Sequence, residues 1–192
     1  FAEAESELAL VEEDLAVVAE QPEVATALLN LLADVVGDHL QQQLDAGAAG
    51  VQIFDTWAGA LDAEDFRRFA LPATQRALAR VKGAPRIFYT KDSGPFLPWL
   101  GEAGGDVIGL DWRVDLRWAR EVLGPVPVQG NLDPIALYAP PHVIAAKTRA
   151  ILEATGGHAQ VFNLGHGVLP TTPIAGVHAM IDAVRAFQPV RP

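Results

Sequence analysis

The residues best suited to chemistry in this chain surround His166, in the segment VFNLGHG at residues 161–167. An apolar run of strand composition ends here, and a histidine flanked by two glycines follows it. Side chains at the carboxyl end of a strand in an α/β protein face the crevice where ligands bind. Histidine changes its charge near neutral pH, and flanking glycines let the backbone come close to a ligand. The pattern predicts a functional histidine, with a histidine that merely closes a loop as the alternative.

Two oxygen-bearing side chains, Asp55 and Thr56, follow another apolar run. Asp55 could offer a carboxylate to a ligand, but an aspartate just past a strand also caps helices, so both roles stay open. Thr56 could offer a hydroxyl group, and its neighbour Trp57 suits a partly apolar pocket. In a barrel of parallel strands, these residues would lie on the same rim as His166.

The basic residues at the ends of the apolar runs are Lys91 and Arg113. Both could bind anionic groups of a substrate. A solvated surface lysine is the simpler interpretation of Lys91, and Arg113 could equally pair with Asp111 or Asp115. These two cations are therefore possible site residues, as is Asp55.

Other polar residues have structural explanations. Asn131 and the pair Asp133-Pro134 are typical of a turn. The sequence has no nucleophile elbow, P-loop, dinucleotide fingerprint or metalloprotease motif. Four further histidines have no convergent partners in the pattern and are interpreted as structural: His39, His142, His158 and His178.

Short apolar runs alternate with helical stretches along the chain. The runs of strand length and composition are 51–56, 86–90, 107–111, 126–130 and 159–164. This alternation predicts a parallel sheet with helical crossovers. Because the runs are apolar throughout, we expect strands covered on both faces.

The segments expected to be helical are 2–19, 23–45, 97–103, 115–123, 141–155 and 174–187. A further helix is predicted to begin near residue 63, because Asp62, with Asp65 three residues on, is typical of an N-cap. Pro72 is expected to break that helix in two, since proline lacks a backbone N–H.

The composition limits the class of protein. The chain has 192 residues, 50% of them hydrophobic, which is enough for one sizeable core. No apolar run reaches the ~20 residues that span a bilayer, so we expect no membrane partner. Without cysteine there is no disulfide framework or thiolate metal site. A cytoplasmic location is the simplest interpretation.

The net charge of −10 is unevenly distributed. Residues 1–50 contain eleven Asp and Glu and no Lys or Arg, which leaves 13 acidic and 14 basic residues in the rest of the chain. We therefore assign the acidity to the solvated face of an N-terminal helical segment. No basic stripe of the kind that binds nucleic acid is present.

We expect residues 1–192 to form a single domain. Five βα units do not close an eight-stranded barrel, which takes ~250 residues. The chain begins in a predicted helix, at Phe1. It therefore looks like the C-terminal part of a longer barrel, whose N-terminal strands are absent from this sequence.

Four ordered segments resemble the uroporphyrinogen decarboxylase family. They are VQIFDTWAG at 51–59, GGDVIGLDWR at 104–113, QGNLDP at 129–134 and FNLGHGVLP at 162–170. The resemblance covers about residues 20–188, and four motifs in the right order form a specific signal. It implies a (β/α)₈ barrel, in which residues 51–165 supply strands four to eight.

The resemblance also implies a function. Family members remove the four acetate carboxyl groups of uroporphyrinogen III as carbon dioxide and give coproporphyrinogen III, on the way to heme. They use no metal or prosthetic group and are usually homodimers. The histidine of the matching motif contacts substrate, which corresponds to His166, and a serine that does likewise is replaced here by Thr56.

The family's catalytic aspartate, basic loop and substrate-contacting tyrosine lie upstream of the matching segments. We therefore expect these 192 residues to be inactive alone. One alternative is a non-catalytic barrel fragment or a porphyrinogen-binding module. A less favoured alternative is a related corrinoid-dependent methyltransferase, because those enzymes hold zinc with His and Cys, and residues 89–91 here are Tyr-Thr-Lys.

Overall fold

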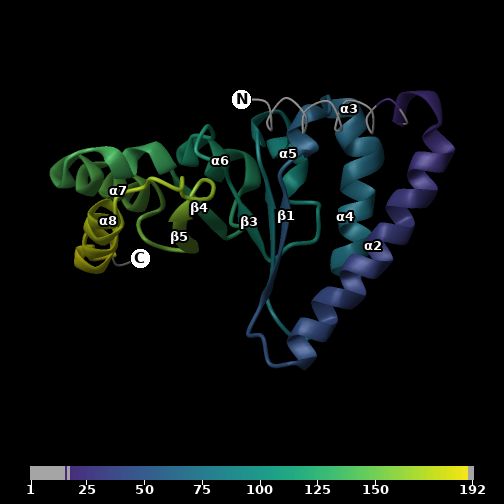
Figure 1. The fold of residues 1–192 in the computed structure, drawn as a ribbon, viewed down its shortest axis with the longest axis horizontal. Coiled ribbons are helices and arrows are strands. Elements are labelled where there is room, and N and C mark those ends of the chain that lie inside the picture. The colour runs from purple at the N-terminus through teal and green to yellow at the C-terminus, as the bar shows by residue number, and fades with distance from the viewer. Residues whose placement is uncertain (1–15, 17, 190–192) are drawn as a thin grey trace.

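The computed structural model describes residue 16 and residues 18–189, and Figure 1 shows helices arranged along a parallel sheet. The five strands of the sheet lie side by side in chain order. They are β1 (Val51–Asp55), β2 (Arg86–Thr90), β3 (Val107–Gly109), β4 (Val128–Leu132) and β5 (Gln160–Leu164). Helical segments connect each strand to the next, which confirms the predicted α/β fold built from βα units.

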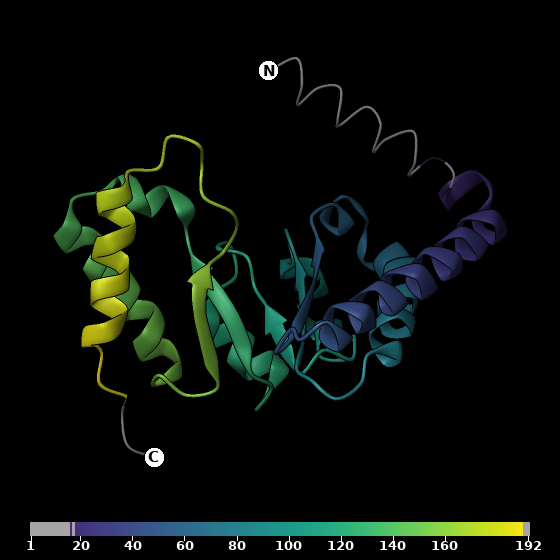
Figure 2. The same cartoon turned by 60° about the horizontal axis from the view of Figure 1, so that its bottom comes forward.

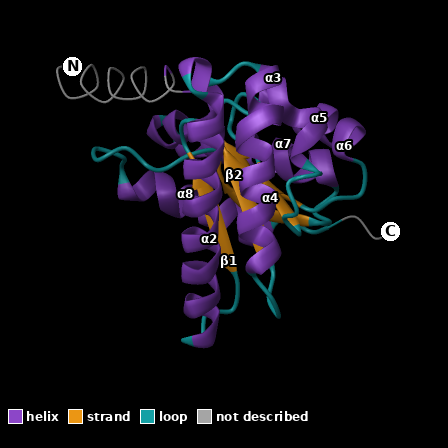
Figure 3. Ribbon diagram, turned by 90° about the vertical axis from the view of Figure 1, so that its right-hand side faces the viewer, coloured by secondary structure: helices purple, strands orange, loops and turns teal. Residues whose placement is uncertain are grey.

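Residue 16 and residues 18–20 are helical. The α-helices that follow them are α2 (Pro22–Asp45), α3 (Ala63–Asp65), α4 (Leu71–Arg80), α5 (Leu97–Leu100), α6 (Leu116–Leu123), α7 (Pro141–Thr155) and α8 (Ile174–Ala186). Figures 1 and 2 place α7 and α8 together beyond β5, at the end of the molecule opposite α2. Figure 3 shows α2 and α4 side by side. The helix predicted over 2–19 lies largely outside the described residues.

Shorter helical turns join the strands to these helices. They are η1 (Ala58–Ala60), η2 (Phe66–Ala70), η3 (Gly94–Phe96) and η4 (Pro134–Tyr138). Turn η2 is a π-helical turn, and the other three are 3₁₀ turns. Three of the four therefore begin within five residues of the end of a strand, where the candidate site residues lie.

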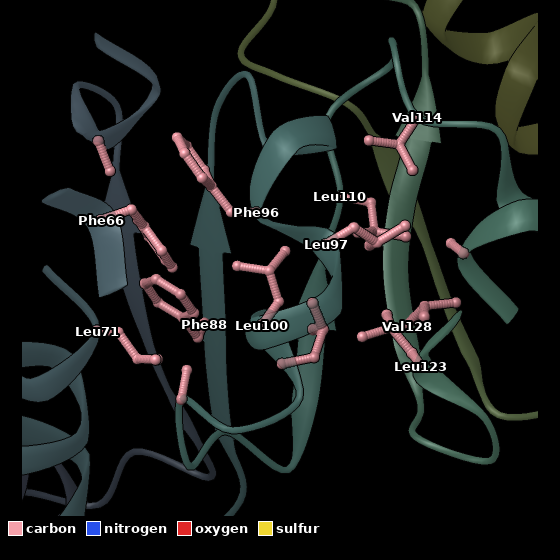
Figure 4. Close-up of a cluster of buried hydrophobic side chains, with 14 of the residues drawn as sticks. Phe66, Leu71, Phe88, Phe96, Leu97, Leu100, Leu110, Val114, Leu123 and Val128 are labelled. Atoms are coloured by element: carbon pink, nitrogen blue, oxygen red, sulfur yellow. The ribbon is translucent and has the colours of Figure 1, made fainter. Parts of the chain in front are cut away.

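The main hydrophobic core lies between the sheet and the helices, as Figure 4 shows. Phe88, Ile108 and Val128 come from three neighbouring strands and are completely buried. On the helical side, the rings of Phe66 and Phe96 stack with their centroids 4.3 Å apart. Alternate residues of a strand face opposite sides, so the residues between these apolar ones face away from the helices.

Two contacts between strands that are not neighbours show that the sheet is curved. Gln129 in β4 donates its side-chain N–H to Gln52 in β1 over 3.2 Å. Tyr89 in β2 donates its hydroxyl to the carbonyl of Gly165, just after β5, over 2.7 Å. In a flat sheet β1 and β4 would be about 14 Å apart. The five strands therefore form a section of a barrel wall whose concave face carries these polar side chains.

The prediction that the strands are covered on both faces is wrong for the edge strands. β4 is buried along its whole length, but Phe54 in β1 is 67% exposed and Val161 in β5 is 46% exposed. Both lie on the concave side, which none of the described residues covers at the edges of the sheet. An open section of barrel explains why apolar strands can be exposed on one face.

The prediction of a turn after the fourth apolar run is confirmed for Asp133 and wrong for Asn131. The fourth strand covers 128–132 instead of the predicted 126–130. Asn131 is therefore a buried strand residue and not part of a turn. Asp133 does form the turn, because its carboxylate accepts the backbone N–H of Ile135 over 2.9 Å and caps η4.

The helix that begins near residue 63 has the predicted cap but not the predicted break. The carboxylate of Asp62 accepts the backbone N–H groups of Glu64 and Asp65, both at 2.9 Å. Pro72 lies in the first turn of α4 and does not interrupt the helical path. The wider π-helical turn η2 precedes it, and the missing N–H of a proline is tolerated in a first turn.

Part of the N-terminal acidity forms ion pairs with helix α4. Arg76 of α4 donates two hydrogen bonds to Asp34 of α2, both at 2.7 Å. Arg80 donates to Asp38 one helical turn further along, over 2.8 Å. These ion pairs join α2 to α4 at the exposed surface, since the side chains of Asp34 and Asp38 are 31% and 56% exposed, in agreement with an acidic face in contact with solvent.

Candidate active site at the carboxyl ends of the strands

His166 lies in the loop directly after β5 and is close to one residue of β2 and one residue of the loop after β3. Its Nδ1 atom is 3.1 Å from the hydroxyl oxygen of Tyr89 in β2. The two rings stack, with centroids 6.0 Å apart and an angle of 14° between the planes. The ring of Trp112, after β3, is 6.1 Å from the imidazole. The ends of β2, β3 and β5 therefore converge at His166.

Two glycines permit the loops to pack this closely. A side chain on Gly165 would collide with the backbone of Trp112, and its Cβ would lie 2.7 Å from the Cβ of Trp112. A Cβ on Gly59, in the loop after β1, would lie 2.5 Å from the Cβ of Asp92 in the loop after β2. Glycine at 165 is what brings His166 against its neighbours from β2 and β3.

The surroundings of His166 favour its neutral form. Burial is the main reason that the pKa of His166 is lower than its ordinary value, and the nearby cation Lys91 lowers it further. Asp111 opposes this shift, and Arg113 adds to it. A neutral imidazole has one N–H donor and one lone pair, so His166 can accept a proton or a hydrogen bond at one ring nitrogen.

Asp111 is completely buried and joins the loops that follow β2 and β3. One carboxylate oxygen accepts both the backbone N–H of Ser93, over 2.8 Å, and its hydroxyl, over 3.1 Å. The other oxygen accepts the backbone N–H of Arg113 over 2.7 Å. These three bonds explain how a buried carboxylate is tolerated here, and they fix the start of the segment that bears Trp112.

The side chain of Arg113 forms an ion pair with Asp92, in the loop after β2. Its guanidinium also lies 4.4 Å from the centroid of the Trp112 ring. The alternative that its side chain pairs with Asp111 or Asp115 is wrong, because the carboxylate of Asp111 bonds Ser93 and the backbone N–H of Arg113, and Asp115 caps α6. Arg113 is thus held at the rim by groups from two loops.

Asp55 and Thr56 have different environments at the end of β1. Asp55 accepts the backbone N–H groups of Trp57, over 3.2 Å, and Ala58, over 2.8 Å, and so closes the turn between β1 and η1. Burial raises the pKa of Asp55, and these two hydrogen bonds lower it in part. Thr56 is half-buried, and its hydroxyl makes no hydrogen bond within the described part of the chain. Its hydroxyl group is free to meet a ligand.

Lys91 follows β2 directly, and its backbone N–H donates to the carbonyl of Asp55 over 3.0 Å. Among the described residues its ammonium group forms no ion pair, while its charge acts on His166. Lys91 and Arg113 both act electrostatically on His166, and these three residues are called the rim cluster below. The described structure shows no side-chain contact that joins Asp55 or Thr56 to this cluster.

A hollow of about 550 Å³ opens between the loop after β3 and helices α6 and α7. It shares Trp112, Arg113 and Asn131 with the rim, and α7 contributes Lys147 and Ile151. Arg113 therefore borders both the rim cluster and this hollow.

Tyr89 and Trp112 are two neighbours of His166 that the sequence analysis does not single out. Tyr89 could have been found from strand alternation, because it follows the buried Phe88 and must face the concave side. No sequence pattern indicates that the Trp112 ring lies near His166. That contact depends on the close approach of Gly165.

The strand ends and their polar side chains define a parallel α/β protein with its candidate ligand site at the carboxyl edge of the sheet. The model of the uroporphyrinogen decarboxylase (URO-D) family matches residues 10–187. The chain belongs to the uroporphyrinogen decarboxylase family.

Curated relatives agree with this assignment. The chain is 43% identical over 166 residues to a uroporphyrinogen decarboxylase of Citrifermentans bemidjiense, an alignment that covers 85% of this chain and 49% of the relative. It is 49% identical over 156 residues to one of Frankia casuarinae, covering 79% of this chain and 42% of the relative. The chain thus spans about half the length of the curated relatives it matches.

Among solved structures, a methyltransferase from Methanosarcina mazei matches with a TM-score of 0.82 and 20% sequence identity, over 90% of this chain and 52% of that chain. At this identity the likeness shows the fold alone. Within residue 16 and residues 18–189, no group of three or more His, Cys, Asp or Glu side chains could hold a metal ion. No helix in the same residues has the length and apolarity to cross a membrane.

Proposed function

We propose that this chain supplies part of the active site of a uroporphyrinogen decarboxylase, a carboxy-lyase that converts uroporphyrinogen III to coproporphyrinogen III. The observation behind the proposal is the position of His166 at the rim, beside the ring of Trp112 that Arg113 covers, in a chain whose relatives bear that name. Lys91 adds a second positive charge that acts on His166. Two cations and a histidine form a suitable surface for a substrate rich in carboxylates.

The proposed reaction uses the electrons of the substrate's own ring. An acid protonates a pyrrole carbon next to the position that bears the acetate group, and the ring becomes an electron sink. The bond between the acetate methylene and its carboxylate then breaks, its electron pair enters the ring, and carbon dioxide leaves. A proton adds to the methylene carbon and the ring proton is lost, which restores aromaticity. Each decarboxylation therefore replaces one carboxylate of the substrate with one proton.

In this reaction the described residues bind and orient the substrate. Lys91 and Arg113 would face substrate carboxylates, Thr56 would donate its hydroxyl, and His166 would contact the substrate at the rim. The main contribution of a protein to such a reaction is to hold the pyrrole ring that bears the acetate group next to an acid in the correct orientation. The family resemblance implies that the catalytic aspartate lies upstream of this chain.

We also propose that these 192 residues do not turn over substrate alone. The substrate bears eight carboxylates, and burying them requires paired cations. Of the two cations in the cluster, Arg113 is already paired with Asp92. The family resemblance further supports a cytoplasmic homodimer for the intact protein, meaning the protein expressed with its complete natural sequence.

The test is a decarboxylation assay with uroporphyrinogen III, in which coproporphyrinogen III is measured as product. The intact protein is expected to form coproporphyrinogen III, and the 192-residue chain to form none at the same concentration. Turnover by the short chain comparable to that of the intact protein would contradict the second proposal. Porphyrinogen binding by the intact protein without turnover would contradict the first and favour a binding module.

A further inference from the structure

Tyr89 has two hydrogen-bond partners at the rim, and it has only one proton to donate. Its hydroxyl oxygen is 2.7 Å from the carbonyl oxygen of Gly165 and 3.1 Å from Nδ1 of His166. A carbonyl oxygen can only accept, so the hydroxyl proton of Tyr89 belongs in the shorter bond to Gly165. The bond to His166 then requires a proton on Nδ1, which donates to the hydroxyl oxygen.

The environment of the Tyr89 side chain keeps its hydroxyl group protonated. Tyr89 is only 4% exposed, and burial is the main cause that raises its pKa well above the ordinary value, with a further contribution from Asp111. The phenol therefore remains protonated and continues to donate to Gly165. The imidazole plane lies 14° from the plane of the phenol ring.

We propose that Tyr89 is a positioning residue that keeps the proton of His166 on Nδ1, so that Nε2 is the nitrogen presented to a ligand. The charged groups that act on His166 are Lys91 after β2, and Asp111 and Arg113 after β3. None of these is hydrogen-bonded to the imidazole in the described structure, so the tautomer is set by Tyr89.

This arrangement determines what His166 can do at the rim. With its proton on Nδ1, neutral His166 offers a lone pair at Nε2, which accepts a hydrogen bond from an N–H or a carboxylic acid. A carboxylate can bind at Nε2 only after that atom takes up a proton. Anion binding at His166 is therefore coupled to the uptake of one proton. The tautomer of His166 is inferred independently of the proposed function, and only the identity of the ligand rests on that function.

The first test needs no substrate. Nitrogen NMR of the intact protein labelled in histidine, with the His166 signal assigned by its loss in His166→Ala, distinguishes the two neutral tautomers. The unaltered protein is expected to show the Nδ1–H tautomer, and Tyr89→Phe to show a shift toward Nε2–H. The chain has two tyrosines, so Tyr138→Phe, which removes a hydroxyl bonded to Thr171, is the matched control and leaves the tautomer unchanged.

The second test measures turnover of uroporphyrinogen III. Tyr89→Phe is expected to lower kcat/KM by roughly three- to tenfold, the range for one lost hydrogen bond, and Tyr138→Phe to leave it unchanged. The inference is overturned if the unaltered protein shows the Nε2–H tautomer. It is also overturned if the folded Tyr89→Phe variant keeps the Nδ1–H tautomer, whatever its turnover. An Nδ1–H tautomer that depends on Tyr89, in a protein without turnover, supports the inference and contradicts the proposed function.

Discussion

Asn131 and Asn163 are register partners in the neighbouring strands β4 and β5, yet they have opposite environments. Asn131 is 6% exposed, and its side-chain amide donates to the carbonyls of Asp111, over 2.8 Å, and Val114, over 2.7 Å. Asn163 is exposed, and within the described part of the chain its side-chain oxygen accepts only the backbone N–H of Leu164. The same residue type thus anchors the loop after β3 in one strand and faces solvent in the other.

Asn131→Asp is expected to destabilise the protein by about 2–3 kcal/mol, because a carboxylate cannot donate to the two buried carbonyls. Asn163→Asp keeps the accepting oxygen and should change the free energy of unfolding by less than about 0.5 kcal/mol. Urea unfolding of the two variants measures the difference. Equal losses in both variants would show that the amide of Asn131 does not anchor the loop.

The ion pair between Arg86 and Asp106 predicts a pH-dependent stability. Arg86 donates to both carboxylate oxygens of Asp106, at 3.0 Å, and this is the main reason that the pKa of Asp106 lies below its ordinary value. A carboxyl whose pKa falls on folding contributes stability above its unfolded pKa, and the contribution is lost as the pH falls through the folded value.

Asp106→Asn should therefore destabilise the protein at pH 7 by less than about 1 kcal/mol, since the carboxylate is 48% exposed. The difference from the unaltered protein should vanish in acid, once Asp106 is protonated in both states. Unfolding measured across this pH range tests the prediction. Asp182 is exposed and forms no ion pair with the described residues, so Asp182→Asn is the control. If the destabilisation caused by Asp182→Asn depends on pH as strongly as that caused by Asp106→Asn, this account is contradicted.

Lys91 is expected to control the basicity of His166. Because its charge helps to lower the pKa of His166, Lys91→Met should raise that pKa. A proton NMR titration of the histidine signals measures the shift. Lys82→Met, which removes a charge before β2 at the opposite end of that strand, should leave the titration unchanged. If the pKa of His166 is unchanged or lower in Lys91→Met, the ammonium group of Lys91 does not act on the imidazole.

Thr56 tests whether a hydroxyl is needed after β1. Thr56→Ser keeps the hydroxyl and removes one methyl group, and kcat/KM should stay within about threefold of the unaltered protein. Thr56→Val keeps the shape without the hydroxyl, and kcat/KM should fall by roughly tenfold if one hydrogen bond to substrate is lost. Equal activity of the Ser and Val variants would exclude a substrate contact by this hydroxyl.

The order of the βα units and the position of His166 could be predicted because both depend on local patterns. Apolar runs with helical stretches between them predict parallel strands, and a histidine after such a run is placed at the carboxyl edge of the sheet. The helix 141–155 was predicted with both of its ends, since Pro141 begins it and Gly156 ends it. These features require no knowledge of contacts distant in the sequence.

The remaining features depend on contacts between distant segments. Asn131 was predicted to form a turn because asparagine favours turns, and only the carbonyls of the β3 loop explain its place in a strand. The partner of Arg113 is Asp92, 21 residues away, instead of a neighbouring aspartate. Tyr89 could be placed on a face by alternation, but its contact with His166 depends on the curvature of the sheet.

The most direct test of the central claim is the rate of uroporphyrinogen III decarboxylation by the intact protein with His166→Ala, compared with His178→Ala. His178 lies exposed in α8, outside the cluster. We expect kcat/KM to fall by roughly a hundredfold or more in His166→Ala, in line with the loss of a group that orients substrate, and to be unchanged in His178→Ala. A His166→Ala variant that folds and decarboxylates uroporphyrinogen at the unaltered rate would contradict the placement of the active site at this rim.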